Sequence, residues 1–263
     1  MKRRSLLRNV AASLLCTGLL AAPLAHADAL AEIKKAGTLR VAVPQDFPPF
    51  GSVGPDMQPQ GYDIDTARLV AKALAVKLEL VPVTSTNRVP YLTTGKVDLV
   101  ISSLGKNPER EKVVDFSVPY APFFNGVFGP KAEKVQSAAD LAGKSVAVTR
   151  GSVEDLELSK IAPANAVIKR FEDNNATVSA YYAGQTQLLA TGNVVAASLG
   201  ENISKRPLQT KFLIKDSPCY IGLPKGELTL QARVNEIIAK AKKDGSLNKI
   251  ALQWLKAPLP AAL

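Results

Sequence analysis

The chain contains one histidine and two cysteines among its 263 residues, and most of this small set lies near the N-terminus. His26 and Cys16 fall within the first 27 residues, a segment that we interpret below as a cleaved export signal. Without that segment the chain has no histidine and one cysteine, Cys219. Catalytic triads with a histidine base, metal sites built from cysteine and histidine, and internal disulfides are then excluded.

The sequence also lacks internal repeats, a glycine-rich nucleotide loop, low-complexity segments and, after residue 20, any long apolar run. Its formal net charge is +10, of which about +6 remains once the four basic residues of the first 27 are removed. A basic surface can suit nucleic acid. Here, however, lysines and arginines are spread singly, without interleaved aromatic residues, so we expect no nucleic-acid partner.

The N-terminus has the three parts of an export signal. Residues 10–20 form an apolar core that is too short to span a bilayer comfortably, and residues 25–27 (AHA) form an A-x-A cleavage site. We predict cleavage after Ala27, which leaves a mature chain that begins at Asp28 outside the cytoplasmic membrane. A pair of arginines near the start also fits a twin-arginine signal, so the export route stays open. The basic residues that precede the apolar core are Lys2, Arg3, Arg4 and Arg8.

A short apolar run over residues 97–101 predicts a buried strand, and a polar segment follows it directly. Ser103, Gly105 and Arg110 lie in that segment, at the C-terminal end of the strand, where open α/β sheets bind their ligands. A guanidinium offers a planar fork of donors that matches a carboxylate, so Arg110 is a candidate anchor for an anionic ligand. The alternative is a surface salt bridge between Arg110 and an adjacent glutamate.

The same region carries a resemblance to a known family. Residues 107–110 (NPER), followed by residues 114–120 (VDFSVPY), resemble the signature of bacterial periplasmic amino-acid-binding proteins, the family 3 solute receptors of ABC importers. The resemblance extends from about Gly37 to Leu255, with several matching blocks in the same order. It implies a type II periplasmic-binding-protein fold: two α/β lobes, each a mixed sheet flanked by helices, joined by two crossover segments.

The resemblance also implies how the chain is divided and where it works. We expect residues 28–124 and 220–263 to form one lobe, and residues 125–219 to form the other. We expect a periplasmic monomer without cofactor or metal, which binds a small molecule between the lobes and meets a membrane ABC permease transiently. Within the first lobe, Asp63 is expected to cap the helix that follows Gly61.

The resemblance assigns binding roles in both lobes. Phe47 stands where an aromatic ring packs on the ligand, and Ser85 and Arg88 match the glutamate/aspartate-binding branch, in which a serine and an arginine contact the side-chain carboxylate. Ser152 and Val153 open a predicted helix at the position that faces the α-carboxylate, and the N–H groups at a helix start attract anions. The alternatives are a core-capping Phe47, a solvated Arg88 and a plain N-cap at Ser152.

Three positions depart from the pattern of the family. The residue five before Arg110 is usually a threonine, whereas Gly105 offers the ligand a backbone N–H alone. The acidic branch has an arginine where Pro44 stands. The aspartate that usually pairs with the ligand ammonium is replaced by Gly192, and the neighbouring Asn193 can offer a neutral oxygen. The sequence therefore leaves open what would bind an ammonium group.

Three classes of function remain. Ser85, Arg88 and Arg110 favour an acidic amino acid such as glutamate or aspartate, whereas Gly192 favours an organic acid without an amine. An enzyme of the same fold, a dehydratase or a lytic transglycosylase, would need a carboxylic acid with a raised pKa. The predicted cleft segments show no obvious buried carboxylate, so we predict that the chain is not an enzyme. The sequence does not separate a transport receptor from a signalling receptor.

Overall fold

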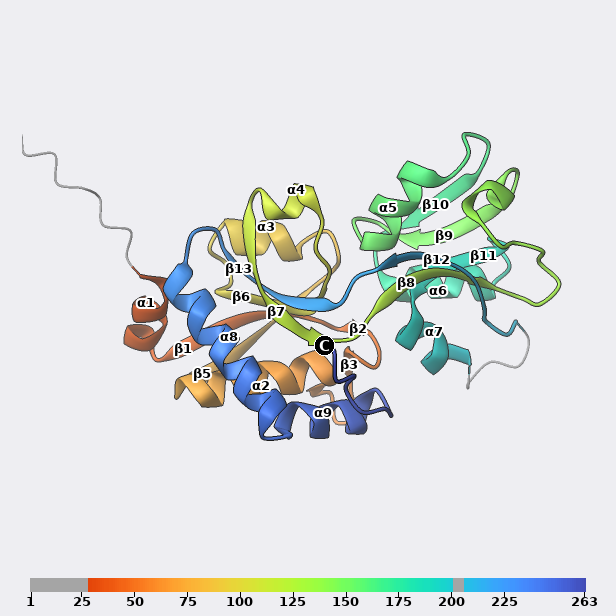
Figure 1. Cartoon of the computed structure of the whole chain (residues 1–263). Helices are drawn as coiled ribbons and strands as arrows, with labels where there is room; N and C mark the ends of the chain where they lie inside the picture. Colours follow the sequence, from red (N-terminus) through yellow and green to blue (C-terminus); the bar gives the residue numbers. More distant parts are fainter. Residues whose placement is uncertain (1–27, 201–205) are drawn as a thin grey trace, which may run out of the picture.

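The computed structural model describes residues 28–200 and 206–263. The predicted export signal, residues 1–27, lies outside the described residues. Two bodies lie side by side, each built around a five-stranded sheet (Figure 1). Within the described ranges, no helix combines the length and the apolar character needed to cross a membrane.

The first sheet has the strand order β5-β1-β6-β13-β7. Strand β1 lies parallel to its neighbours β5 and β6, whereas β13 lies antiparallel to β6 and β7. The strands are β1 (Thr38–Pro44), β5 (Lys77–Val83), β6 (Leu99–Leu104), β7 (Val114–Ala121) and β13 (Cys219–Pro224). The helices of this lobe are α1 (Ala29–Ala36), α2 (Tyr62–Leu74), α3 (Arg88–Thr93), α4 (Pro108–Glu111), α8 (Leu228–Lys243) and α9 (Ser246–Trp254).

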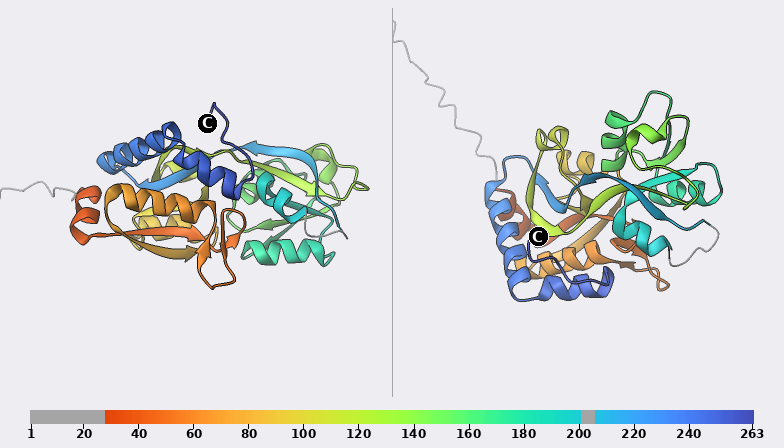
Figure 2. Two further views of the ribbon diagram at one scale, coloured as in Figure 1. Left: turned by 90° about the horizontal axis from the view of Figure 1, so that it is seen from below. Right: turned by 45° about the vertical axis from the view of Figure 1, so that its right-hand side comes forward.

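Helices cover both faces of the first sheet. The apolar side chains of α2 and α8, such as Ile64 and Val234, pack with Leu39 and Val41 of β1 in the larger core cluster. Residues of α3 pack on the opposite face in a smaller cluster, and Figure 2 shows α8 and α9 along one side of the lobe. Every residue of β6 is buried as a result, which is why its sequence is apolar until it reaches the serines at its end.

The second sheet repeats this arrangement in the order β10-β9-β11-β8-β12. Its strands are β8 (Phe124–Gly129), β9 (Ser145–Thr149), β10 (Val167–Phe171), β11 (Leu188–Gly192) and β12 (Gln209–Asp216). Its helical elements are the 3-10 helix η1 (Ala138–Leu141), α5 (Val153–Ile161), α6 (Asn174–Tyr182) and α7 (Asn193–Gly200). A small sheet of β2 (Asp46–Phe47), β3 (Gly51–Val53) and β4 (Pro59–Gln60) follows β1.

The chain crosses between the sheets twice. It leaves the first sheet between β7 and β8 and returns between β12 and β13. The two crossing segments are hydrogen-bonded to each other, because Ser217 N donates to Phe123 O at 3.1 Å. Pairing continues on both sides, with Asp216 opposite Phe124 and Cys219 opposite Ala121. The lobes are thus joined by a two-stranded connection rather than by two independent linkers.

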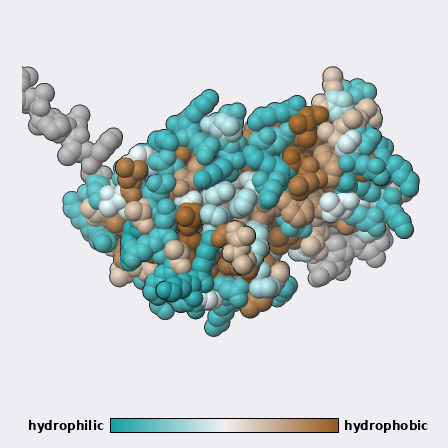
Figure 3. Space-filling model, viewed as in Figure 1, coloured by the Kyte–Doolittle hydropathy of each residue, from teal (hydrophilic) through white to brown (hydrophobic). Residues whose placement is uncertain are grey.

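The surface seen in Figure 3 is mostly hydrophilic, with a hydrophobic group over the second lobe near α5 and β12. These two elements carry Leu156 and Leu213, whose side chains are exposed. Most of the other large apolar side chains are buried in the core of one lobe or the other.

Candidate functional site

A cavity lies where the two lobes meet. The first lobe lines it with Pro44, Asp46, Phe47, Val83, Ser85, Arg88, Ser102 and Ser103. The second lobe lines it with Thr149, Ser152, Val153, Glu154, Asn174, Ala190 and Thr191, and Phe123 comes from the crossing segment. Most of these residues follow the C-terminal end of a strand or begin a helix, which is where the sheets of α/β proteins present ligand-binding groups.

The structure brings six of the ten predicted site residues to this cavity: Phe47, Ser85, Arg88, Ser103, Ser152 and Val153. The other four, Gly105, Arg110, Gly192 and Asn193, lie around it without lining it. Ser152 lines the cavity and is also the N-cap of α5, where its Oγ accepts a hydrogen bond from Asp155 N at 3.1 Å. Phe47 likewise packs in the core, stacked on Phe50 with ring centroids 6.0 Å apart, and reaches the cavity.

Arg88 is buried, contrary to the alternative of a solvated arginine. It is the first residue of α3, and its guanidinium donates to Ser102 O at 2.5 Å and to Ser85 O at 3.4 Å. Burial lowers the pKa of Arg88, and the nearby charge of Glu154 opposes that effect. The contacts with backbone carbonyls hold the guanidinium at the cavity wall.

Ser103 has an unusual backbone conformation that a buried carboxylate holds in place. Its φ is +41°, in the left-handed region that residues other than glycine rarely adopt. Its N–H donates to Asp63 Oδ2 at 2.7 Å, and Tyr120 Oη donates to Asp63 Oδ1 at 2.6 Å. The prediction that Asp63 caps its helix is wrong, because Gly61 is the N-cap and Asp63 lies in the first turn. Its carboxylate instead fixes the end of β6.

Asp63 should make stability depend on pH. Burial raises its pKa from the ordinary value of 3.8 to about 7, although Tyr120, Ser103 and the charge of Arg88 oppose the rise. Between these values the folded chain holds a proton that the unfolded chain has released, so stability falls as pH rises from about 4 to about 7. The shift corresponds to at most about 4 kcal/mol.

We therefore expect wild type to lose stability relative to Asp63→Asn as pH rises through this window. An asparagine can accept from Ser103 N and donate to Tyr120 Oη, so it imitates the protonated acid. Urea unfolding of both proteins at pH 4 to 8 measures the difference. Two parallel stability curves would show that Asp63 is ionised in the folded chain throughout.

Arg110 connects the two lobes directly. Arg110 lies on the short helix α4, which Asn107 caps. The Arg110 guanidinium donates to Gly105 O at 2.7 Å and, across the junction between the lobes, to Gly151 O at 2.9 Å. Burial and the charge of Arg88 lower the pKa of Arg110 to about 9, so it stays protonated at neutral pH. None of the ion pairs among residues 28–200 and 206–263 includes Arg110, which contradicts the alternative of a surface salt bridge.

Gly105 is a glycine for a steric reason. A Cβ added there would lie 2.5 Å from Ser217 Oγ and 2.9 Å from Val153 Cγ2. These distances are too short for non-bonded atoms, so the threonine usual in the family would force Ser217 and Val153 to shift in this arrangement of the lobes. Gly105 contributes its carbonyl to Arg110 instead.

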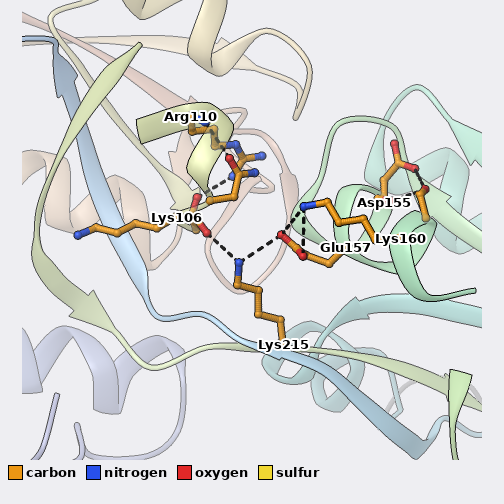
Figure 4. A network of polar contacts seen from close by, with 9 residues as sticks. Lys106, Arg110, Asp155, Glu157, Lys160 and Lys215 are labelled. Atoms are coloured by element: carbon orange, nitrogen blue, oxygen red, sulfur yellow. Dashed lines mark hydrogen bonds and ion pairs between the residues drawn. The ribbon is translucent and has the colours of Figure 1, made fainter. Parts of the chain in front are cut away.

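Two further contacts join the lobes near the cavity. Asp46 accepts hydrogen bonds from Asn174 N at 2.6 Å and from Asn174 Nδ2 at 3.2 Å. Lys215 Nζ donates to Lys106 O at 3.1 Å and lies 3.2 Å from Glu157 Oε1, as Figure 4 shows. Together with Arg110, these groups hold the lobes in direct contact around the cavity.

Gly192 and Asn193 serve the packing of the second lobe. A Cβ on Gly192 would lie 1.9 Å from Cζ of Phe123, so the phenyl ring occupies the space that any side chain would need. Asn193 Oδ1 accepts a hydrogen bond from Phe124 N at 3.1 Å, which fastens α7 to the crossing strand. In this structure neither residue faces the cavity.

The expectation of a cleft without a buried carboxylate is wrong. Glu154 is 5% exposed and Asp46 is 8% exposed, and both line the cavity. Burial raises the pKa of Glu154, while hydrogen bonds to its own N–H and to Ser152, and the charges of Arg88 and Arg110, oppose the rise. The sequence offered one indication that Glu154 lies at the cavity, namely its position two residues after Ser152. That indication is weak, because acidic residues in the first turn of a helix are common on protein surfaces.

A small cavity between two α/β lobes, which are joined by a paired double crossing, defines a type II periplasmic-binding-protein fold. The chain belongs to the bacterial extracellular solute-binding proteins, family 3, whose model matches residues 39–257. Members of this family work outside the cytoplasm, in the service of ABC transporters.

Individual relatives agree with this assignment. The ABC transporter glutamine-binding protein GlnH of Bacillus subtilis is 30% identical over 87% of this chain and 85% of its own length. The L-glutamate/L-aspartate-binding protein of Pseudomonas aeruginosa is 28% identical over 96% and 90%. A crystal structure of the ancestral amino acid-binding protein AncCDT-1, a precursor of cyclohexadienyl dehydratase, is 33% identical with a TM-score of 0.78, and the match covers 87% of this chain and all of that one.

Proposed function

We propose that this chain is a periplasmic receptor that binds an L-amino acid between its lobes and delivers it to an ABC importer. The observation that carries the proposal is the position of two buried guanidinium groups, Arg88 and Arg110, where the lobes meet. A buried cation is costly unless a partner compensates it, and a ligand carboxylate is a stronger partner than a backbone carbonyl. The names of the relatives support an amino acid as the ligand.

Within this class we propose an acidic amino acid, glutamate or aspartate. Arg88 already lies at the cavity beside Ser85 and Ser103, and it suits the side-chain carboxylate. Arg110 suits the α-carboxylate once it exchanges one of its carbonyl partners, Gly105 O or Gly151 O, for the ligand. The second lobe adds Ser152 and Val153 at the start of α5. Because each lobe then contributes to a single ligand, closure and binding stabilise each other.

Calorimetric titration of residues 28–263, stripped of ligand by unfolding and refolding, tests the proposal. The panel contains glutamate, aspartate, glutamine, arginine and cystine, with succinate and malate as acids without an amine. We expect tight binding of glutamate or aspartate, with the neutral and basic amino acids weaker by at least tenfold, roughly the effect of one charged hydrogen bond. Preference for glutamine would keep the receptor role and reject the acidic ligand, whereas binding of succinate or malate alone would reject the amino acid.

An enzyme is the second candidate, and Glu154 is the observation that favours it, because a buried carboxylic acid with a raised pKa can act as a general acid. We propose that the chain is not an enzyme, since its relatives are named as binding proteins. Conversion of a cyclohexadienol to the aromatic product, followed by ultraviolet absorbance, would contradict this proposal.

We also retain the sequence-based proposals for processing and organisation. The mature chain begins at Asp28, and the lobes comprise residues 28–124 with 220–263, and residues 125–219. It works as a monomer without cofactor or metal. N-terminal sequencing of the exported protein tests whether the mature chain begins at Asp28. The mass of the protein in solution tests whether it is a monomer.

A further inference from the structure

We propose that Glu154 binds the α-ammonium group of the ligand, and so supplies the negative charge that Gly192 cannot. This inference rests on the proposed function, because it requires a ligand with an amine. It moves the ammonium site from the end of β11, where Gly192 stands, to the first turn of α5.

The space at Gly192 is closed to an acidic side chain. The phenyl ring of Phe123 lies where a Cβ would have to be, and this ring is held by Phe50 and Phe47, at centroid distances of 5.4 and 6.2 Å. An amine in the cavity must therefore find its anionic partner elsewhere. A buried ammonium without such a partner would lose most of its hydration and gain nothing in return.

Two carboxylates line the cavity, those of Asp46 and Glu154, and they differ in the hydrogen bonds that they already accept. Both oxygens of Asp46 accept hydrogen bonds from Asn174 at the contact between the lobes. Glu154 has hydrogen bonds within its own helix start, to its own N–H and to Ser152. No ion pair among the described residues includes Glu154, although it is 95% buried. Glu154 is thus the carboxylate with remaining capacity for a cation.

The positive charge of Arg88 and the negative charge of Glu154 are also placed to bind the two charged groups of an amino acid. Arg88 belongs to the first lobe and Glu154 to the second, and both line the cavity. The two charges attract each other, yet none of the ion pairs among the described residues joins them. A zwitterion between them places a carboxylate toward Arg88 or Arg110 and its ammonium toward Glu154. A ligand that lacks the amine offers no direct cationic partner to Glu154 and places only carboxylates near it, so Glu154 selects amino acids over simple dicarboxylates.

The test compares two ligands that differ by the amine, L-glutamate and glutarate, on wild type and Glu154→Gln. Glutamine has almost the same shape as glutamate and removes the charge. We expect the affinity for glutamate to fall roughly tenfold to a hundredfold, as for a lost charge-assisted hydrogen bond. The affinity for glutarate should stay the same or rise, because an unfavourable charge is removed.

Three further proteins control the comparison. Glu172→Gln changes an exposed glutamate and should bind both ligands as wild type does. Asp46→Asn disturbs the contact with Asn174 and should weaken both ligands alike. Glu154→Asp keeps the charge on a shorter side chain and should retain the preference for glutamate over glutarate, at reduced affinity.

The outcomes separate this inference from the proposed function. Equal weakening of glutamate and glutarate by Glu154→Gln would assign Glu154 a purely structural role and overturn the inference, as would unchanged binding of glutamate. In both cases wild type still binds glutamate and the proposed function stands. If wild type itself binds no amino acid, the proposed function fails and the inference fails with it.

Discussion

Replacement of Arg110 with alanine is expected to lower the affinity for the amino-acid ligand at least a hundredfold. The variant loses the proposed charged partner of the α-carboxylate, and such a loss typically costs about 2–5 kcal/mol when the remaining charge stays buried. It also loses the hydrogen bond from Arg110 to Gly151 O, which joins the lobes. Titration calorimetry against the ligand identified by the panel measures the effect.

The fold of the variant should remain intact, because Arg110 lies on a short helix at the lobe junction and not within either apolar core. Thermal unfolding without ligand checks this point. Arg68→Ala is the matched control, since Arg68 is exposed and pairs with Asp65 three residues earlier on α2. Arg110→Lys should be intermediate, because a lysine keeps the charge but cannot form two parallel hydrogen bonds. Normal binding by Arg110→Ala would reject Arg110 as the anchor.

Restoration of the aspartate of the family at Gly192 is expected to destabilise the chain by about 3 kcal/mol or more, instead of improving ligand binding. The new Cβ would lie 1.9 Å from the Phe123 ring, and overpacking of this severity forces side chains and backbone to shift. Urea unfolding of Gly192→Asp measures the loss.

A double variant tests the cause. Phe123→Leu shortens the side chain that blocks Gly192, so Gly192→Asp should cost less in that background than in wild type. Asn193→Asp is the control for charge alone. It introduces a carboxylate at the adjacent position, and Oδ1 of the new aspartate can still accept a hydrogen bond from Phe124 N. If Gly192→Asp unfolds at the same urea concentration as wild type, the ring moves freely and the steric explanation is wrong.

The elements and the general position of the site follow from local pattern. The apolar run before Ser103, the helix start at Ser152 and the position of Arg88 after a strand all place polar groups at strand ends, which is enough to locate the cavity. The partners of these groups do not follow from local pattern, because they come from distant parts of the chain. Asp63 contacts Ser103 from forty residues away, and no feature around Asp63 distinguishes this role from helix capping.

The lobe junction explains the remaining differences between prediction and structure. Glu154 has the sequence context of an exposed first-turn carboxylate, yet it is buried at a cavity that residues of both lobes line. The sequence shows that Gly192 cannot supply a charge. The reason, a phenyl ring from the crossing segment, depends on a contact between residues that are 69 positions apart.

The strand order of the first sheet also constrains how the chain can be made. β13 lies between β6 and β7, yet it is synthesised after the whole second lobe. Until residues 219–224 emerge, β6 and β7 lack their shared neighbour, and each presents an open edge to other chains. The second lobe, whose sheet is formed by one continuous stretch, can fold without waiting. During synthesis and export, the half that holds Arg88 and Arg110 is thus the last to be completed, and the nascent protein must be kept from aggregating until its final strand arrives.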